Sequence, residues 1–119
     1  MKVVSIHKAA AEPFVHSVFT GPDVTRQDLA PDSSEFAVNM VNFGKGVRNK
    51  FHAHDSDQIL IVTAGKGIVA TESEERAVSE GEVIFIPAGE THWHGAAKDA
   101  EFSQIYIQRK NSVLTQIED

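Results

Sequence analysis

Two His-x-His pairs, His52 with His54 and His92 with His94, are the residues of this sequence whose type and spacing point to chemistry. In a β-strand, residues i and i+2 project from the same face roughly 6.6–6.8 Å apart along the chain, so both imidazoles of a pair can face one ion. Neutral imidazole is the side chain that most commonly binds metals. The first pair therefore indicates a divalent metal site, and a chance pair that binds nothing is the alternative.

An oxygen ligand is expected just after the first pair, where Asp57 and Gln58 are the candidates. Residues 55–57 read as a three-residue turn, after which the chain returns as the strand that starts at Gln58. A carboxylate is the better anionic ligand. If Gln58 and Leu60 point inward, however, Asp57 has the opposite parity and faces solvent. We favour Gln58 and interpret Asp55 and Asp57 as turn formers.

The elements that must position these residues are strands. Short runs rich in β-branched and aromatic residues alternate with turns, and this pattern is typical of a sandwich or barrel rather than of βαβ units. Residues 65–67 predict a hairpin with a glycine turn, and residues 73–76 are interpreted as another turn. The expected strands are residues 36–41, 58–63, 68–71, 83–86, 91–95 and 102–108.

The sequence divides into three parts. Residues 1–34 form an N-terminal strand and arm, with a strand expected at residues 14–19 and a loop rich in Gly, Pro, Asp and Ser at residues 21–34. Residues 35–108 form the β-barrel, and residues 109–119 form a C-terminal tail.

Two of the expected strands, residues 59–62 and 83–86, are apolar at both parities. A half-exposed strand alternates between apolar and polar residues, so we expect these strands to be covered on both faces. One face lines the barrel, and the other needs a second sheet or a second subunit. We favour a homodimer, and cover by the N-terminal arm is the alternative.

Two longer patterns surround the histidines and resemble the paired motifs of the cupin family. The first has Gln58 where the family usually has Glu, and the second has Ala96 where the family usually ends in Asn. Fifteen residues, 66–80, separate the patterns, as in small single-domain cupins. Residues 92–96 are further similar to small cupins that occur alone or beside carboxymuconolactone-decarboxylase-like domains. The patterns are Gly46-x5-His52-x-His54-x3-Gln58-x6-Gly65 and Gly81-x5-Pro87-x-Gly89-x2-His92.

The resemblance implies an all-β fold, the conical jelly-roll β-barrel that is also called a double-stranded β-helix. It also implies one divalent metal ion inside the barrel, with His52, His54, Gln58 and His92 as its ligands. In that arrangement His92 comes from a strand remote in sequence, after a turn that Pro87 stiffens. A hydrogen-bonded core histidine is the alternative for His92.

The amide of Gln58 changes the charge balance of this expected metal site. Three neutral imidazoles and one amide leave the +2 charge of the ion uncompensated by protein, whereas a Glu would reduce it. A more positive ion binds less tightly but is a stronger Lewis acid, and it favours an anionic or enolate-type ligand. Fe, Mn, Ni or Zn suits this donor set, and the sequence does not choose among them. In six-fold geometry two positions stay open.

His94 shares the parity of His92, so we expect it to point into the barrel as well. It is the candidate catalytic residue, as a general acid or base, with a supporting role beside the metal ligands or an inert lining role as alternatives. Trp93 then faces outward. Tyr106, the only tyrosine, is interpreted as a core or rim residue rather than a catalytic phenol.

Composition excludes several classes of protein. The 119 residues include 17 acidic and 11 basic side chains, for a net charge of −6, with no basic cluster, so we expect no nucleic-acid partner. No apolar run approaches the roughly 20 residues that span a bilayer, so we expect no membrane partner. The absence of cysteine excludes thiolate metal sites. The first residues lack the apolar core of a signal peptide, so we expect a soluble cytoplasmic domain.

These observations favour a metal-dependent enzyme that acts on a small oxygen-rich organic anion or diketone. Its reaction class is oxidoreductase (dioxygenase), isomerase, cyclase or decarboxylase, by direct binding of the substrate to the metal. The alternative is a non-catalytic module that binds or senses a small ligand at the metal. A third hypothesis is an unmetallated barrel that serves in assembly, because one fold hosts many functions.

Overall fold

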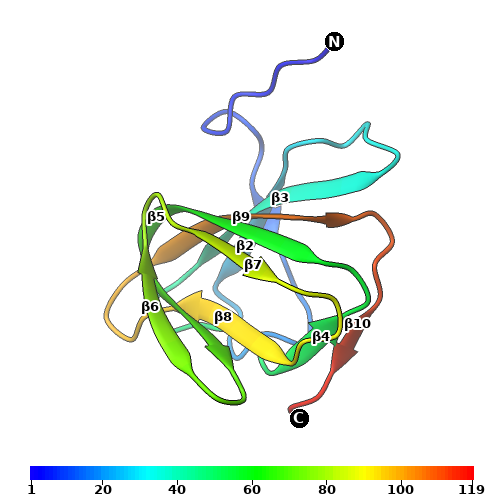
Figure 1. Cartoon of the computed structure of the whole chain (residues 1–119). Coiled ribbons are helices and arrows are strands. Elements are labelled where there is room, and N and C mark those ends of the chain that lie inside the picture. Colours follow the sequence, from blue (N-terminus) through cyan, green and yellow to red (C-terminus); the bar gives the residue numbers. More distant parts are fainter.

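The computed structural model describes all 119 residues and shows an all-β chain (Figure 1). Its strands form one antiparallel sheet that curls on itself into a half-barrel. The expected all-β barrel architecture is confirmed. The chain has no helix long and apolar enough to cross a membrane. The strands are β1 (Glu12–Pro13), β2 (Val24–Asp28), β3 (Phe36–Phe43), β4 (His52–His54), β5 (Gln58–Thr71), β6 (Glu75–Ser79), β7 (Val83–Ile86), β8 (His92–Ala96), β9 (Phe102–Arg109) and β10 (Leu114–Gln116).

Strand β5 joins the two halves of the sheet. Its first part pairs with β7 and β9, and its second part pairs with β6 and β8. The register shifts between Val62 and Ala64. Gly65 follows with φ +77°, and a Cβ there would lie 2.0 Å from the Glu101 carbonyl oxygen. The hairpin expected at residues 65–67 is therefore wrong, because the glycine bends a single 14-residue strand between the two halves.

The residues before β3 also differ from expectation. The strand expected at residues 14–19 is not formed. Instead, Phe14 and Phe19 pack edge to face with ring centroids 5.0 Å apart, and Phe19 in turn contacts Phe43. Strand β2 lies within the predicted loop and pairs with β3, and β6 begins inside the turn expected at residues 73–76. The aromatic residues that suggested a strand are used to close one end of the core.

The interior of the half-barrel changes from apolar to polar along the strands. The apolar end holds the cluster of Val24, Val41, Phe43, Val62, Val78, Ala96 and Phe102. Because inward positions repeat every second residue, Phe102 is followed on β9 by Gln104, and Phe43 is preceded on β3 by Val41 and Asn39. Gln104 and Asn39 are both buried. The apolar end stabilises the fold, and the polar end is available for a site.

The C-terminal strand is part of the sheet. β10 pairs with β4 in the register that sets Leu114 opposite His54 and Gln116 opposite His52. Arg48 fixes this end, because its guanidinium donates to both carboxylate oxygens of Glu118, at 2.9 and 3.2 Å. The same guanidinium lies over the Trp93 ring at 4.5 Å, so Trp93 is covered by its own chain. The division into residues 1–34, 35–108 and 109–119 stays a prediction.

Candidate metal centre

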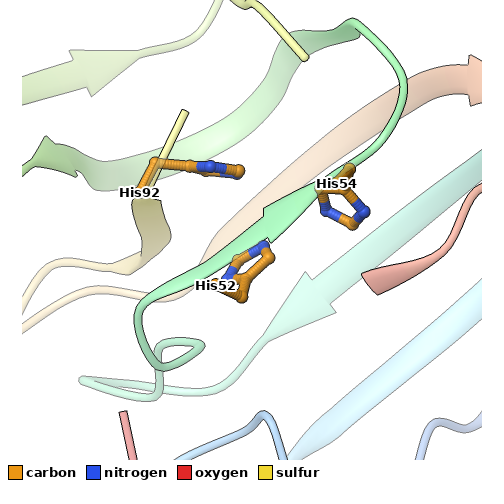
Figure 2. Close-up of side chains that lie close together, drawn as sticks. All are labelled: His52, His54 and His92. Atoms are coloured by element: carbon orange, nitrogen blue, oxygen red, sulfur yellow. The ribbon is translucent and has the colours of Figure 1, made fainter. Parts of the chain in front are cut away.

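Three imidazoles from two strands meet at the polar end of the half-barrel (Figure 2). His52 and His54 lie on β4, His92 begins β8, and the strand register sets His52 opposite His92. One ring nitrogen of each residue lies within 4.8 Å of those of the other two. The side chains are buried, with 1%, 9% and 1% of the residue area exposed for His52, His54 and His92. The sequence thus identified three residues that the fold brings together, and their role as ligands stays a prediction.

The turn before β8 fixes the position of His92. Glu90 donates its backbone N–H to the Pro87 carbonyl at 3.2 Å. Gly89, with φ +83°, donates its backbone N–H to the His54 carbonyl at 2.8 Å. This bond ties the turn that precedes His92 directly to the strand that carries His52 and His54.

Backbone carbonyls set the ring orientation of two of the histidines. His52 donates its Nδ1–H to the Lys50 carbonyl at 2.6 Å, and His92 donates its Nδ1–H to the Glu90 carbonyl at 2.8 Å. Each ring then keeps its Nε2 lone pair free, and this is the arrangement in which proteins hold metal-binding histidines. His92 Nε2 and His54 Nδ1 are buried without a hydrogen-bond partner. Such unpaired buried nitrogens fit a cation as their missing partner.

Burial keeps these histidines neutral. Desolvation, followed by the nearby His92, lowers the pKa of His52 to about 3 and that of His54 to about 4. Desolvation also lowers the pKa of His92. A low pKa means that the rings are unprotonated at neutral pH, the form that binds metal ions.

Gln58 lines the same cavity as His52 and His54. Its side chain is buried, and its Nε2 donates to Gln108 Oε1 at 3.0 Å. Its Oε1 is buried without a partner. This orientation leaves the better metal ligand of the amide, its oxygen, unpaired in the cavity. Gln58 reaches the cavity from β5, which pairs with β7 and β9 and not with β4.

Asp55 and Asp57 are exposed and act in the turn, as the sequence predicts. Asp55 accepts hydrogen bonds from Val113 N and Ser112 Oγ, at 2.8 and 2.9 Å. Asp57 accepts one from Ala88 N at 2.9 Å. Both carboxylates are used at the surface, so neither competes with Gln58.

His94 lies beside the three histidines, buried with 4% of its area exposed. Its ring is nearly parallel to that of His92, with centroids 5.7 Å apart. Gln104 donates its Nε2–H to His94 Nδ1 at 2.7 Å, and Asn49 Oδ1 accepts the His94 backbone N–H at 2.8 Å. Burial and the neighbouring histidines hold the pKa of His94 well below its usual value. Its catalytic role stays a prediction.

Sequence reasoning missed the two amides that hold His94. Asn49 and Gln104 are both buried, and Gln104 Oε1 has no hydrogen-bond partner. The alternation on β9 could have revealed Gln104, because Phe102, Gln104 and Tyr106 share one face. Nothing in the spacing of the sequence indicates Asn49.

A cavity of about 130 Å³ adjoins these residues, and none of the side chains that line it is Lys, Arg, Asp or Glu. Aromatic rings from Phe14, Phe19, Phe43 and Tyr106 contribute to its wall. Tyr106 Oη accepts a hydrogen bond from Asn39 Nδ2 at 3.0 Å, and desolvation raises the pKa of this phenol. The cavity combines aromatic walls with neutral amide and imidazole groups, and this donor set fits a divalent cation with a small organic ligand beside it.

Comparison with known proteins agrees with this geometry. The profile of the Cupin domain family matches residues 39–107. Among curated proteins, (R)-mandelonitrile lyase of Granulicella tundricola is 40% identical to this chain over 84 residues, which are 68% of this chain and 63% of that protein.

Solved structures share the fold over nearly the whole chain. A cupin-like protein of Thermotoga maritima superposes with a TM-score of 0.85 at 31% identity, covering 98% of this chain and 90% of that one. The polyketide cyclase RemF of Streptomyces resistomycificus superposes with a TM-score of 0.86 at 20% identity, covering 98% of this chain and 85% of that one. The likeness to the cyclase shows the fold alone.

The chain spans only part of the curated relatives that it matches. The alignments cover 63% of the mandelonitrile lyase and between 15% and 30% of four others. Those others include a mannose-6-phosphate isomerase, an acireductone dioxygenase and a transcriptional activator. Several of the relatives are therefore enzymes, of different reaction classes, and one is a regulator.

Proposed function

This chain belongs to the cupin family, and we propose that it is a metal-dependent enzyme that activates a small oxygen-bearing organic substrate bound directly to the ion. The proposed ligands are His52, His54, Gln58 and His92, and the proposed ion is Fe, Mn, Ni or Zn. The reaction is a lyase, isomerase, cyclase, decarboxylase or dioxygenase reaction.

The observation that carries this proposal is a neutral ligand set, of which His52, His54 and Gln58 line a cavity without charged side chains. When bound, the ion supplies Lewis-acid chemistry and polarises a carbonyl or hydroxyl oxygen. In a site of low dielectric constant its charge is weakly screened. No carboxylate lines the cavity to compensate the positive charge of the ion, so the compensating negative charge would come from the substrate. A substrate that is an anion, or that develops negative charge on oxygen, is therefore favoured.

The protein's own residues have distinct tasks in this proposal. The carbonyls of Lys50 and Glu90 orient His52 and His92, so that their Nε2 atoms face inward without a proton. His94 is the proposed proton carrier: its neutral ring accepts the Gln104 Nε2–H at Nδ1, so its own hydrogen lies on Nε2, from which it would donate to a substrate oxygen. The unpaired Gln104 Oε1 accepts a hydrogen bond from a substrate hydroxyl. Phe14 and Phe19 exclude water from one wall of the cavity.

The size and walls of the cavity favour a small substrate with a single ring. Its volume is about 130 Å³, and a cavity of roughly 150 Å³ with apolar walls is known to hold one benzene molecule. An aryl carbonyl or hydroxyl compound, a diketone or a catechol fits this description. The relative named (R)-mandelonitrile lyase adds aromatic cyanohydrins as the first candidates.

The proposal is tested on chelated protein that is reloaded separately with Fe(II), Mn(II), Ni(II) or Zn(II). Cleavage of (R)-mandelonitrile to benzaldehyde and cyanide is followed by absorbance, and diketones and catechols are followed with and without O2. We expect turnover with at least one ion, and its loss in His52→Ala and His92→Ala. His7→Ala is the matched control, because His7 is exposed and lies outside the cluster. No rate above metal-free protein in any combination would contradict an enzymatic role.

The second candidate function is a non-catalytic module that senses or binds a small ligand at the metal. The relative that is a transcriptional activator favours it. Isothermal titration of the metal-loaded protein with the same compounds distinguishes the two functions. Saturable binding, with each compound recovered unchanged, would support the module and exclude catalysis on that compound.

A further inference from the structure

The inner face of the sheet carries an arginine at its rim. Antiparallel register places residues directly opposite one another on the same face of a sheet. Arg26 on β2 lies opposite Val41 on β3, and Val41 lies opposite Gln104 on β9. Val41 and Gln104 both line the cavity beside the candidate metal centre. Arg26 therefore belongs to the inner face, in a row of residues that leads into the cavity.

The Arg26 guanidinium lies against the cavity wall without lining the cavity itself. Its Cζ lies over the Phe14 ring, 4.3 Å from the ring centroid, and Phe14 is part of that wall. The side chain of Arg26 is 36% exposed. The guanidinium thus stands between the aromatic wall and solvent, where it can meet a group that projects from the cavity.

The Tyr106 hydroxyl is a neutral hydrogen-bond donor at the same rim. Its Oη accepts a hydrogen bond from the buried Asn39 Nδ2 at 3.0 Å, and this bond leaves the hydroxyl proton free to donate. Desolvation raises the pKa of Tyr106, and the nearby Arg26 guanidinium opposes that rise. The phenol is therefore protonated at neutral pH, and its oxygen lies near the positive charge of Arg26.

We propose that Arg26 and Tyr106 form a second binding point for the substrate, which recognises a carboxylate at the end of the molecule remote from the metal. The inference rests on the proposed function, in which the ion binds the other end. The guanidinium presents a planar fork of N–H donors that matches the two oxygens of a carboxylate. Arg26 and Tyr106 come from β2 and β9, whereas His52 and His54 come from β4 in the other half of the sheet.

Two acidic side chains near Arg26 set the strength of this binding point. Glu12 lies opposite Arg26 in the β1–β2 register, with 4.0 Å between its Oε1 and Arg26 Nη2, and its side chain is 66% exposed. A pair this long and this exposed contributes little binding energy. Asp28 is exposed, and its Oδ1 accepts the Ala30 backbone N–H at 3.2 Å. A substrate carboxylate at hydrogen-bond distance would therefore replace Glu12 as the partner of Arg26.

Isothermal titration of the metal-loaded full chain with protocatechuic acid and with its neutral amide tests the proposal. Both compounds offer the ion the same catechol, and only the acid carries a carboxylate at the other end of the ring. We expect the acid to bind roughly tenfold more tightly than the amide in wild type. Arg26→Gln should remove this preference, Tyr106→Phe should reduce it, and Glu12→Gln should increase it, because Glu12 no longer competes for the guanidinium.

Arg109→Gln is the matched control for the loss of one positive charge. Arg109 also pairs with an acidic residue, with 3.0 Å between its Nη2 and Asp55 Oδ1, and its side chain is 56% exposed. We expect this variant to keep the wild-type preference for the acid. Circular dichroism checks that each variant is folded, and the gain expected for Glu12→Gln does not depend on weakening the protein.

The pair of compounds separates this inference from the proposed function. Binding of acid and amide with equal affinity would overturn the carboxylate-binding point alone and leave the metal centre standing. Binding of neither compound to any metal-loaded form would overturn both. A preference that Arg26→Gln and Arg109→Gln reduce equally would show an effect of net charge only and would also overturn the role of Arg26.

Discussion

Replacing Gln58 by Glu tests whether this side chain is a metal ligand. Gln58 is 3% exposed, and its only hydrogen bond is donated to Gln108 Oε1. A carboxyl group at this position loses that donor, although Gln108 can turn its amide and donate instead. A buried carboxyl without full pairing is unfavourable, so we expect Gln58→Glu to lose about 1–3 kcal/mol of stability in chelated protein.

In metal-loaded protein we expect Gln58→Glu to raise the stability of the fold instead of lowering it. The new carboxylate is the only anionic ligand beside the three imidazoles, and we expect it to tighten metal binding roughly a hundredfold, about 2.7 kcal/mol. Ligand binding adds to the free energy of unfolding in proportion to the logarithm of affinity. For a chain of 119 residues this corresponds to an additional rise of about 10 °C in Tm on metal addition.

Differential scanning fluorimetry of chelated and metal-loaded protein measures both effects. Gln104→Glu is the matched control, because Gln104 is equally buried and lines the same cavity but bonds to His94. We expect it to lose stability without metal and to gain much less on metal addition. An equal metal-induced rise in Tm for wild type, Gln58→Glu and Gln104→Glu would refute Gln58 as a ligand.

Three further predictions concern the histidine cluster and its supports. His92→Ala should abolish stoichiometric metal binding, measured by elemental analysis after dialysis, while His7→Ala retains it, because only His92 belongs to the cluster. The pKa values of His52 and His54 fall from the ordinary 6.5 to about 3 and about 4 in the folded chain. Between these values and pH 6.5 the unfolded chain binds more protons than the folded chain, so the chelated protein should lose stability as the pH falls below 6.5. Urea unfolding at pH 7.5 and 5 should show a loss of roughly 2 kcal/mol per histidine, and a flat profile would contradict the burial argument. Gly95→Ala should lower stability by about 2–3 kcal/mol in thermal melts, because its Cβ would lie 2.3 Å from the Arg48 Cα and 2.7 Å from the Val47 carbonyl oxygen.

The histidine geometry was predictable because it depends on a local rule. The two-residue repeat of a strand puts His52 and His54 on one face whatever the rest of the chain does. Joining them to His92 required a resemblance to a known family, since the β4–β8 contact links residues 40 positions apart. The burial of Asn49 and Gln104 against His94 also depends on long-range packing, and the local pattern does not encode it.

The errors in the strands have one physical cause. A glycine with φ above zero serves equally well in a hairpin turn and in a bulge that bends a continuous strand. At Gly65 the chain forms a bulge, because the Glu101 carbonyl packs against the position where a Cβ would lie. Glu101 is remote in sequence, so the local pattern does not reveal this contact. Likewise, the polar residues of β2 and β6 form strands because partner strands are available to them, and not because of their own propensity.

The distribution of buried polar groups bears on how a bound cation would affect the stability of the fold. Only 25 of 119 residues are buried, and nine of these are polar. Four buried side-chain atoms have no hydrogen-bond partner, and all four belong to histidines and glutamines at or beside the candidate metal centre: His54, Gln58, His92 and Gln104. Each unpaired group costs about 1–3 kcal/mol. In our proposal, a cation at the histidine cluster would be the partner of the unpaired nitrogens. If a cation binds there, the metal-loaded protein should be more stable than the chelated protein, and chelation should lower its Tm.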